Sequence, residues 1–431
     1  MRYAATAPGG RMPAAATGSE LPAYERYSPM ISELMAYREG LAVDGLRIRR
    51  AREDDWDALR DCYDRAFGGV HAKDFESWKR QFRLTDVIVA EDVSDPDAPF
   101  VAGTGSVIRM RVAVPGGAEL DVAACAQGMV ATTHQNRGLY SKIQAEMMYI
   151  ALETGADVFA AMPGPGGNYG AVGIASHTRR LRIDRRRAKL RAGADDSPPA
   201  RELRPSVARD RLREIYDRWQ RITPGALSRS EFYWPATYDD SSCVITHPDG
   251  YVIYDLIGDT VRVRDFCALT LPAHRELLRC LLGHGEYREV LLDTAVDDPT
   301  PLLLGDPRVA ATTGVDTGVW MWILNSPKAF EARAYRADFH GVLEIDDPYG
   351  MSPGRFTLDV TDGRGSWTPA PEGVPADLRL SPAELASVYF GALTPLELHR
   401  AGRITESTPG TVAALDQALA PLRRPFNITP F

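Results

Sequence analysis

Apolar residues recur with two different periods along this chain, and the change of period marks out its elements. Residues 120–130 have the pattern of a strand that ends in an apolar pair, whereas residues 138–154 place Leu139, Ile143 and Met147 at helical spacing. The loop between them is polar. A loop that enters a helix presents several unpaired backbone N–H groups at one point, so this pattern predicts an anion site suited to a pyrophosphate. An ordinary strand-to-helix turn with a glycine at Gly138 is the alternative.

The same periods divide residues 46–191 into a mixed series of strands and helices. Helices are predicted at 54–67 and 75–82, in addition to the one at 138–154. Strands are predicted at 46–50, 87–90, 101–114, 120–130, 157–161 and 181–190. A polar, proline-rich stretch at 192–205 has the composition of a linker.

A second unit at 206–326 loosely repeats this order. Helices are predicted at 209–221 and 272–282, and strands at 243–246, 250–257, 261–268, 289–292 and 318–324. No second Gln-x-x-Gly loop appears in it. A degenerate copy of the first unit without a cofactor and an unrelated α/β domain both remain open.

The two ends of the chain follow other patterns. Residues 327–431 combine strands at 341–346 and 354–361 with helices that begin near 329, 381, 394 and 411. Residues 1–45 form an N-terminal extension whose first 23 residues are rich in Ala, Gly, Pro and Thr. Such a composition predicts a partly flexible arm.

Composition narrows the classes of function. A length of 431 residues suits two or three domains with a large core. A net charge of −8 argues against nucleic acid or an anionic membrane as partner and suits cationic substrates. The chain lacks an apolar run of ~18 residues, which would be needed for a membrane span, and residues 1–20 lack the apolar core of a secretory signal.

Cysteine, histidine and arginine positions add three expectations. Five cysteines without close pairs predict reduced thiols in a cytoplasmic protein. Eight histidines without metal-binding spacing lead us to expect no metal site. The basic run at 179–187 alternates charge with Leu181 and Ile183, which favours a solvated or subunit-facing strand over a nucleic-acid surface.

The polar loop also carries a resemblance. The run Gln135, Asn136, Arg137, Gly138, Leu139 and Tyr140 resembles the (Gln/Arg)-x-x-Gly-x-(Gly/Ala) loop with which GCN5-related N-acetyltransferases grip the pyrophosphate of coenzyme A, although Tyr140 replaces a small residue. The preceding Val-Ala-Thr-Thr-His at 130–134 is similar to the lead of the Eis (enhanced intracellular survival) family within that superfamily. The resemblance implies a coenzyme A site formed by Met129, Val130, Gln135, Asn136, Arg137, Gly138 and Leu139.

Further matches to the Eis family extend from residue 46 to the end. They include Gly-Gly-Asn-Tyr-Gly at 166–170, His-Pro-Asp-Gly-Tyr at 247–251 and Ile-Leu-Asn-Ser-Pro at 323–327, and the final region resembles a sterol-carrier-protein domain. The family implies an α/β (α+β) fold of tandem acetyltransferase domains, at 46–191 and 206–326. It also implies a sterol-carrier-like domain at 327–431, whose C-terminus returns to the active site.

By this resemblance, Tyr169 is the general acid and the terminal carboxylate of Phe431 the base. An alkylammonium with a pKa of about 10.4 must lose a proton before it can attack a thioester, so a base is required. Phe67 and Trp78 would line the substrate pocket. A packed tyrosine and a frayed chain end are the alternatives for Tyr169 and Phe431.

Departures from the family bear on the substrate. Gly68 or Gly69, and Pro430, stand where the family has acidic residues, so the pocket should be less acidic than one for aminoglycosides. We therefore expect an acetyl-CoA-dependent N-acyltransferase for a primary amine of a small molecule, an antibiotic or natural product. A non-catalytic protein that binds coenzyme A or a hydrophobic ligand is the alternative. The family also implies a homo-oligomer, by default a hexamer.

Overall fold

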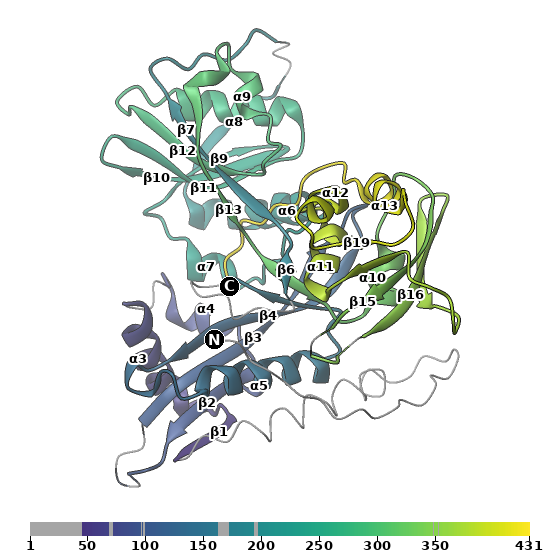
Figure 1. The fold of residues 1–431 in the computed structure, drawn as a ribbon. Helices are drawn as coiled ribbons and strands as arrows, with labels where there is room; N and C mark the ends of the chain where they lie inside the picture. The colour runs from purple at the N-terminus through teal and green to yellow at the C-terminus, as the bar shows by residue number, and fades with distance from the viewer. Residues whose placement is uncertain are drawn as a thin grey trace.

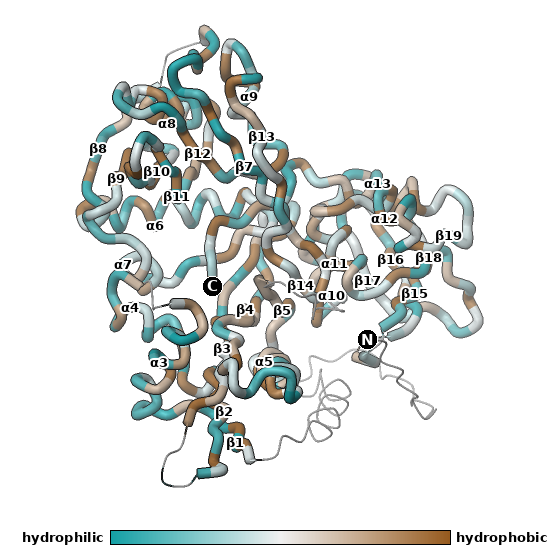
Figure 2. The backbone as a smooth tube through the Cα atoms, turned by 60° about the vertical axis from the view of Figure 1, so that its left-hand side comes forward, coloured by the Kyte–Doolittle hydropathy of each residue, from teal (hydrophilic) through white to brown (hydrophobic). Residues whose placement is uncertain are grey.

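The computed structural model describes residues 45–68, 72–95, 97, 100–162, 172–193, 197–347, 349–351 and 353–431. Their strands form three sheets, and helices pack against them (Figure 1). The predicted extension at residues 1–45 lies outside the described residues, apart from Gly45. In two views the C-terminus lies between the first and second sheets (Figures 1 and 2), although the preceding helices belong to the third region.

The first sheet is covered on both faces. Alternate residues of its second strand enter different cores, with Ile88 and Ala90 packed towards helix α5 and Val87 and Val89 towards helix α3. Such double burial explains the continuous apolar run in this strand. The strand order is β1 (Leu46–Arg50), β2 (Val87–Asp92), β3 (Phe100–Ala113), β4 (Glu119–Val130), β5 (Val158–Ala161), β14 (Trp320–Ile323) and β6 (Gly173–Ile174), and the helices are α3 (Trp56–Phe67), α4 (Phe75–Lys79) and α5 (Leu139–Glu153).

The pairing of β4 with β5 stops partway along β4. It ends at Cys125 and Ala161, where β5 also ends, while β4 continues to Val130. Just past that point β4 bulges against β3, and Gln127 adopts a positive φ of 54°. The bulge bends β4 locally, directly before the polar loop.

The second sheet contains a strand that the sequence analysis assigned to the first unit. The strand predicted at 181–190 forms as β7 (His177–Asp184), but it pairs with β12 (Glu289–Thr294) and β13 (Ala310–Thr317). In exchange, the strand predicted at 318–324 forms as β14 and pairs between β5 and β6 of the first sheet. The local pattern predicts a strand and not its partner, because partners lie far apart in sequence.

The order of the second sheet is β13, β7, β12, β11, β10, β9 and β8, and β8 occupies part of the predicted linker at 192–205. Arg180 pairs with Asp316 at 2.7 Å and Arg182 with Glu289 at 3.5 Å, so acids on adjacent strands offset part of the basic run. The strands are β8 (Arg201–Leu203), β9 (Cys243–His247), β10 (Gly250–Ile257), β11 (Thr260–Ala268), β12 (Glu289–Thr294) and β13 (Ala310–Thr317), and the helices are α6 (Pro205–Ile222), α7 (Tyr233–Thr237), α8 (Leu271–Leu282) and α9 (Thr300–Leu303).

The third region shares a core with the first sheet. Val112, Leu120 and Met321 of that sheet pack in one cluster with Phe330 and Tyr389. Gly173 allows the contact, because a Cβ there would overlap the carbonyl of Ala383 in α11. The strands are β15 (Phe339–Ile345), β16 (Gly354–Thr361), β17 (Arg364–Pro369), β18 (Leu378–Leu380) and β19 (Thr405–Glu406), and the helices are α10 (Ser326–Ala332), α11 (Pro382–Phe390), α12 (Pro395–Arg400) and α13 (Thr411–Leu419). Within the described ranges, none of the helices is both long and apolar enough to cross a membrane.

Candidate active site

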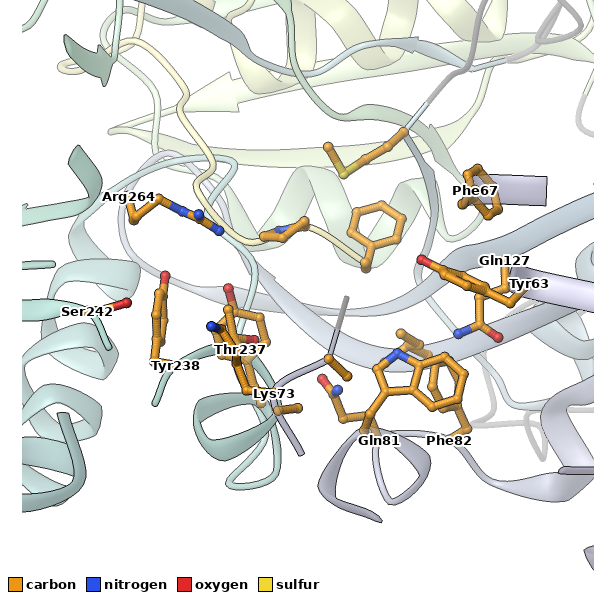
Figure 3. Close-up of a pocket in the computed structure, with 18 of the residues that line it drawn as sticks. Tyr63, Phe67, Lys73, Gln81, Phe82, Gln127, Thr237, Tyr238, Ser242 and Arg264 are labelled. Carbon is orange, nitrogen blue, oxygen red and sulfur yellow. The ribbon is translucent and has the colours of Figure 1, made fainter. Parts of the chain in front are cut away.

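A cavity of about 1350 Å³ lies between the first and second sheets. Figure 3 shows side chains from the first unit, such as Tyr63 and Gln127, on one side and Tyr238 and Arg264 from the second unit on the other. The chain end also lines it. Eight of the lining residues are aromatic, namely Tyr63, Phe67, Trp78, Phe82, Tyr140, Tyr233, Tyr238 and Phe431. The second unit is therefore part of the site, which its sequence did not reveal.

Both aromatic residues expected to bind substrate line this cavity. Trp78, in α4, stacks on Phe75 with ring centroids 5.4 Å apart and meets Phe82 edge-on at 5.0 Å. Phe67, at the end of α3, keeps 52% of its surface exposed and packs on Tyr63. An apolar or aromatic body would gain most from such a wall.

Charged side chains are few among the described lining residues. They are Lys73, Asp255 and Arg264. Asp255 accepts hydrogen bonds from Arg264 at 3.2 Å and from the Ser242 hydroxyl at 3.0 Å, so its charge is already offset. Gly68 ends α3 with a positive φ of 75° and brings no carboxylate to the wall, and Gly69 lies outside the described residues.

Two other acids near Trp78 are engaged elsewhere. The Asp74 carboxylate caps α4 by accepting hydrogen bonds from the backbone N–H groups of Glu76 and Ser77. It also accepts one from the Ser77 hydroxyl, and this bond, together with the two backbone bonds, lowers the pKa of Asp74. Glu76 pairs with Lys79 at 2.8 Å. Neither lines the cavity, so they do not replace the missing acids.

The C-terminus reaches the cavity. Phe431 is half-buried, packs against both the core shared with the third region and the core beneath α3, and lines the cavity together with Pro430. A second cavity, of about 270 Å³, lies on its other side and includes Arg109, Asp217 and Arg229. The ordered position of Phe431 argues against a frayed end. Tyr169 lies outside the described residues, while Met162, which precedes that gap, lines the main cavity.

The predicted cofactor loop lies at the start of α5. Gln135, Asn136, Arg137 and Gly138 are exposed, whereas Leu139 is buried beneath the helix. Asn136 and Gly138 have positive φ values of 62° and 77°, which turn the chain sharply into the helix. The first turn of α5 leaves N–H groups without intrahelical partners, in the arrangement that binds phosphates.

Contacts at both ends of the loop fix its position. His134 is buried before it, with Nε2 3.0 Å from the Asp92 carboxylate. Met129 and Val130 pair with Thr104 and Gly103 of β3, and beyond Cys125 β4 has no β5 partner. Tyr140, the unusual residue of the motif, lines the cavity and lies 3.3 Å from the position that a Cβ on Gly128 would take. A tyrosine is accommodated here because Gly128 has no side chain.

Cys125 is the one thiol among the described lining residues, and a thiol forms an acyl-enzyme through its thiolate. Burial raises the pKa of its thiol to about 12, so the reactive thiolate is scarce at neutral pH. This favours direct attack of a substrate on an activated acyl group. Within the described residues, no group of three or more His, Cys, Asp or Glu could hold a metal ion.

Comparison with known families agrees with this architecture. Residues 47–175 and 225–324 each match an acetyltransferase (GNAT) domain, and residues 326–428 match a sterol carrier protein domain. The match at 225–324 decides between the two alternatives for the second unit in favour of an acetyltransferase-like domain. The expected fold class of two such domains and a sterol-carrier-like domain is confirmed.

Similar proteins cover nearly the whole chain. N-acetyltransferase Eis from Mycobacterium tuberculosis is 31% identical over 390 residues, which cover 85% of this chain and 95% of that protein. An uncharacterized N-acetyltransferase from Streptomyces griseus is 29% identical over 80% of this chain and 91% of its own. The structure of Eis1 from Mycobacterium abscessus superimposes with a TM-score of 0.77 at 25% identity, and the alignment covers 90% of this chain and 100% of that one.

Proposed function

The chain belongs to the Eis family of N-acetyltransferases, and from that premise we propose that its main cavity accepts a small molecule with one primary amine on an apolar or aromatic body. Acetyl-CoA is the donor in this proposal. The observation that carries the acceptor class is the wall itself, where aromatic rings outnumber charged groups and the one acidic side chain among the described lining residues is paired.

The cofactor site of the proposal is the loop Gln135–Leu139. Its exposed backbone and the N-terminus of a 15-residue helix favour the pyrophosphate of coenzyme A. The acetyl thioester would then lie beside the end of β4, beyond Cys125, where β4 has no β5 partner. Backbone N–H groups at Met129 or Val130 would stabilise the oxyanion there.

The proposed reaction needs three proton transfers. The Phe431 carboxylate takes a proton from the ammonium, and the neutral nitrogen attacks the acetyl carbonyl carbon. The C–S bond breaks as the tetrahedral intermediate collapses, and the Tyr169 phenol gives its proton to the coenzyme A thiolate. The nitrogen then loses its second proton to the Tyr169 phenolate, so the proton released overall is the one that Phe431 took up. Position supports Phe431 in this role, because the chain end lines the cavity, and general-base catalysis contributes about 10²–10⁴-fold.

A hydrophobic-ligand carrier is less favoured. The third region contributes to a cavity of about 120 Å³ lined by Phe356 and Trp367 and to one of about 300 Å³ lined by Leu393 and Leu419, and both are much smaller than the main cavity of about 1350 Å³. Ligand sites commonly span about 300–1,000 Å³. We also propose, from the family resemblance, that the protein is a hexamer and that it is a cytoplasmic enzyme. On the same ground we propose that it modifies an antibiotic or natural product.

Coenzyme A release over a panel of amines tests the proposed acceptor. Matched assays with acetyl-CoA should give a higher kcat/KM for arylalkyl monoamines than for kanamycin-type aminoglycosides. The Phe67→Ala variant should lower kcat/KM for an arylalkylamine more than for a short alkylamine, since only the former contacts the ring. Efficient multiple acetylation of an aminoglycoside would contradict the acceptor class while leaving the acetyltransferase activity intact.

A further inference from the structure

The last residues of the chain lie along a segment of the second unit. That segment, residues 224–229, pairs with β3 through bonds from Gly225 N to Ala113 O and from Ser228 N to Arg111 O, each 2.8 Å. The tail pairs with it in turn, since Phe426 N donates to Pro224 O at 2.9 Å and Leu227 N to the Asn427 side-chain oxygen at 3.1 Å. The tail is therefore held against the first sheet through residues 224–229.

A buried ion pair lies at the end of this contact. Arg229 and Asp265 form two hydrogen bonds of 2.5 and 3.1 Å, and their side chains are 0% and 1% exposed. The Arg229 guanidinium also lies over the rings of Tyr216 and Tyr233, at 4.1 and 4.4 Å from their centroids. A buried charge persists only when its geometry and hydrogen bonds are nearly complete, so this arginine is held in one orientation.

Two of the remaining donors of Arg229 point at the tail, and a third reaches the Tyr251 hydroxyl at 3.4 Å. Nε donates to the Thr429 hydroxyl at 2.9 Å, and a terminal nitrogen donates to the Ile428 carbonyl at 3.3 Å. Tyr216 donates its proton to the Leu227 carbonyl at 2.6 Å, so at 2.5 Å it must accept the Thr429 proton. Thr429 is 0% exposed, and the chain ends two residues later.

We propose that Arg229, fixed by Asp265 and acting through Thr429, is a positioning residue that directs the Phe431 carboxylate into the main cavity. The inference rests on the proposed function, in which that carboxylate is the base. We call the hydrogen bond from Arg229 to Thr429 the clamp. Pro430 and Phe431 are the two residues from the clamp to the terminal carboxylate, and both have few rotatable bonds. Fixing Thr429 therefore confines the chain end.

Thr429→Val tests the clamp because it removes the hydroxyl and keeps the shape. Thr429→Ser restores the hydroxyl. Thr300→Val is the matched control, since Thr300 is also 0% exposed and bonds a side chain, His274 Nε2 at 2.9 Å, away from the tail. All variants are assayed at full length for thermal midpoint, hydrogen exchange of residues 420–431, and kcat.

In the Thr429→Val variant, the backbone amide hydrogens of residues 420–431 should exchange faster than in the wild type. Its kcat for an alkylamine should fall about tenfold or more. For an arylhydrazine of similar shape, which is already neutral at pH 8, kcat should fall less than threefold, a difference that general loss of structure would not produce. Thr429→Ser and Thr300→Val should stay near wild type. Unchanged tail exchange in Thr429→Val would overturn the clamp itself. Faster tail exchange with unchanged kcat for both acceptors would show that the clamp holds the tail but has no role in catalysis. In that case the Phe431 carboxylate would not be the base of the proposed function.

Discussion

Gly138 is the residue on which the cofactor assignment depends most. Its φ is 77°, and a Cβ there would meet nothing within 4 Å, so substitution strains the backbone without a clash. Asp and Asn both tolerate this conformation better than other side chains. We predict that Gly138→Asp weakens coenzyme A binding at least tenfold, about 1.4 kcal/mol, because it places an anion beside the pyrophosphate.

Gly138→Asn is the control for this prediction, because it has the same shape without the charge and should lose much less affinity. Isothermal titration calorimetry on the two folded variants measures both. Equal affinities for Asp and Asn variants, both close to wild type, would remove the loop from the cofactor site.

Pro430 offers the corresponding test on the acceptor side. It is exposed and lines the main cavity, so a longer polar side chain can be placed there. A partly exposed ion pair contributes about 0.2–1 kcal/mol. Pro430→Glu should therefore raise kcat/KM for a diamine relative to a monoamine of similar length by up to about fivefold.

Pro430→Gln should leave that ratio where it is in the wild type, since it adds no charge. The ratio of kcat/KM for the diamine to kcat/KM for the monoamine is measured by steady-state kinetics at low and high salt. The increase in this ratio that Pro430→Glu produces should be smaller at high salt. A gain of the same size in the glutamine variant would mean that flexibility at the chain end, not charge, selects the acceptor.

The sequence could predict the parts of the site that are contiguous. Gly138 and its neighbours form one short motif between a strand and a helix, and Phe67 and Trp78 sit on adjacent helices. Tyr233, Tyr238 and Arg264 were missed, because nothing local distinguishes them from core or surface residues. They reach the cavity only through the packing of α7 and β11 against the first unit.

At the level of elements, strands were easier to predict than their pairing. The alternation of Leu181 and Ile183 with arginines located β7, and the apolar run Trp320–Ile323 located β14. Each then joined the sheet of the other unit. Partner choice depends on contacts across more than a hundred residues, as in the pairing of Trp322 with Phe159, which a local period does not encode.

Helix α8 carries a pH-dependent contact that can be tested. Glu276 accepts from Arg279 at 2.7 Å and from the Ala200 backbone N–H at 3.0 Å, and these bonds lower the pKa of its carboxyl to about 2. A group whose folded pKa is depressed stabilises the fold above its unfolded pKa, near 4.5. That stabilisation is lost as the pH falls from there through about 2.

Glu276→Gln should therefore unfold at lower urea than the wild type at pH 7, and the difference between their midpoints should shrink by roughly half at pH 3. Glu286→Gln, an exposed change near the end of the same helix, should show little difference at either pH. A midpoint difference that is the same at both pH values would show that the carboxylate charge is not what stabilises this contact.

On the scale of the whole molecule, the three regions converge on the chain end. The first sheet supplies the part of β4 that has no β5 partner, and the second unit supplies α7 and the Arg229–Asp265 pair. The tail of the third region ends between the first two sheets (Figure 1), where it lines the cavity. A sterol-carrier-like domain whose own cavities are much smaller than the main cavity thus has a clear use as the support of the terminal carboxylate. The site exists only when all three regions are folded together.

Extending the chain beyond Phe431 tests this account most directly. Two residues, Gly-Ser, appended after Phe431 would move the carboxylate away while the Arg229–Thr429 contact stays in place. We predict that kcat for an alkylamine falls about 100-fold or more, whereas thermal midpoint and coenzyme A affinity stay unchanged, and that the same two residues added at the N-terminus have no effect. A C-terminally extended enzyme with normal kcat would contradict the central claim that the chain end is the base.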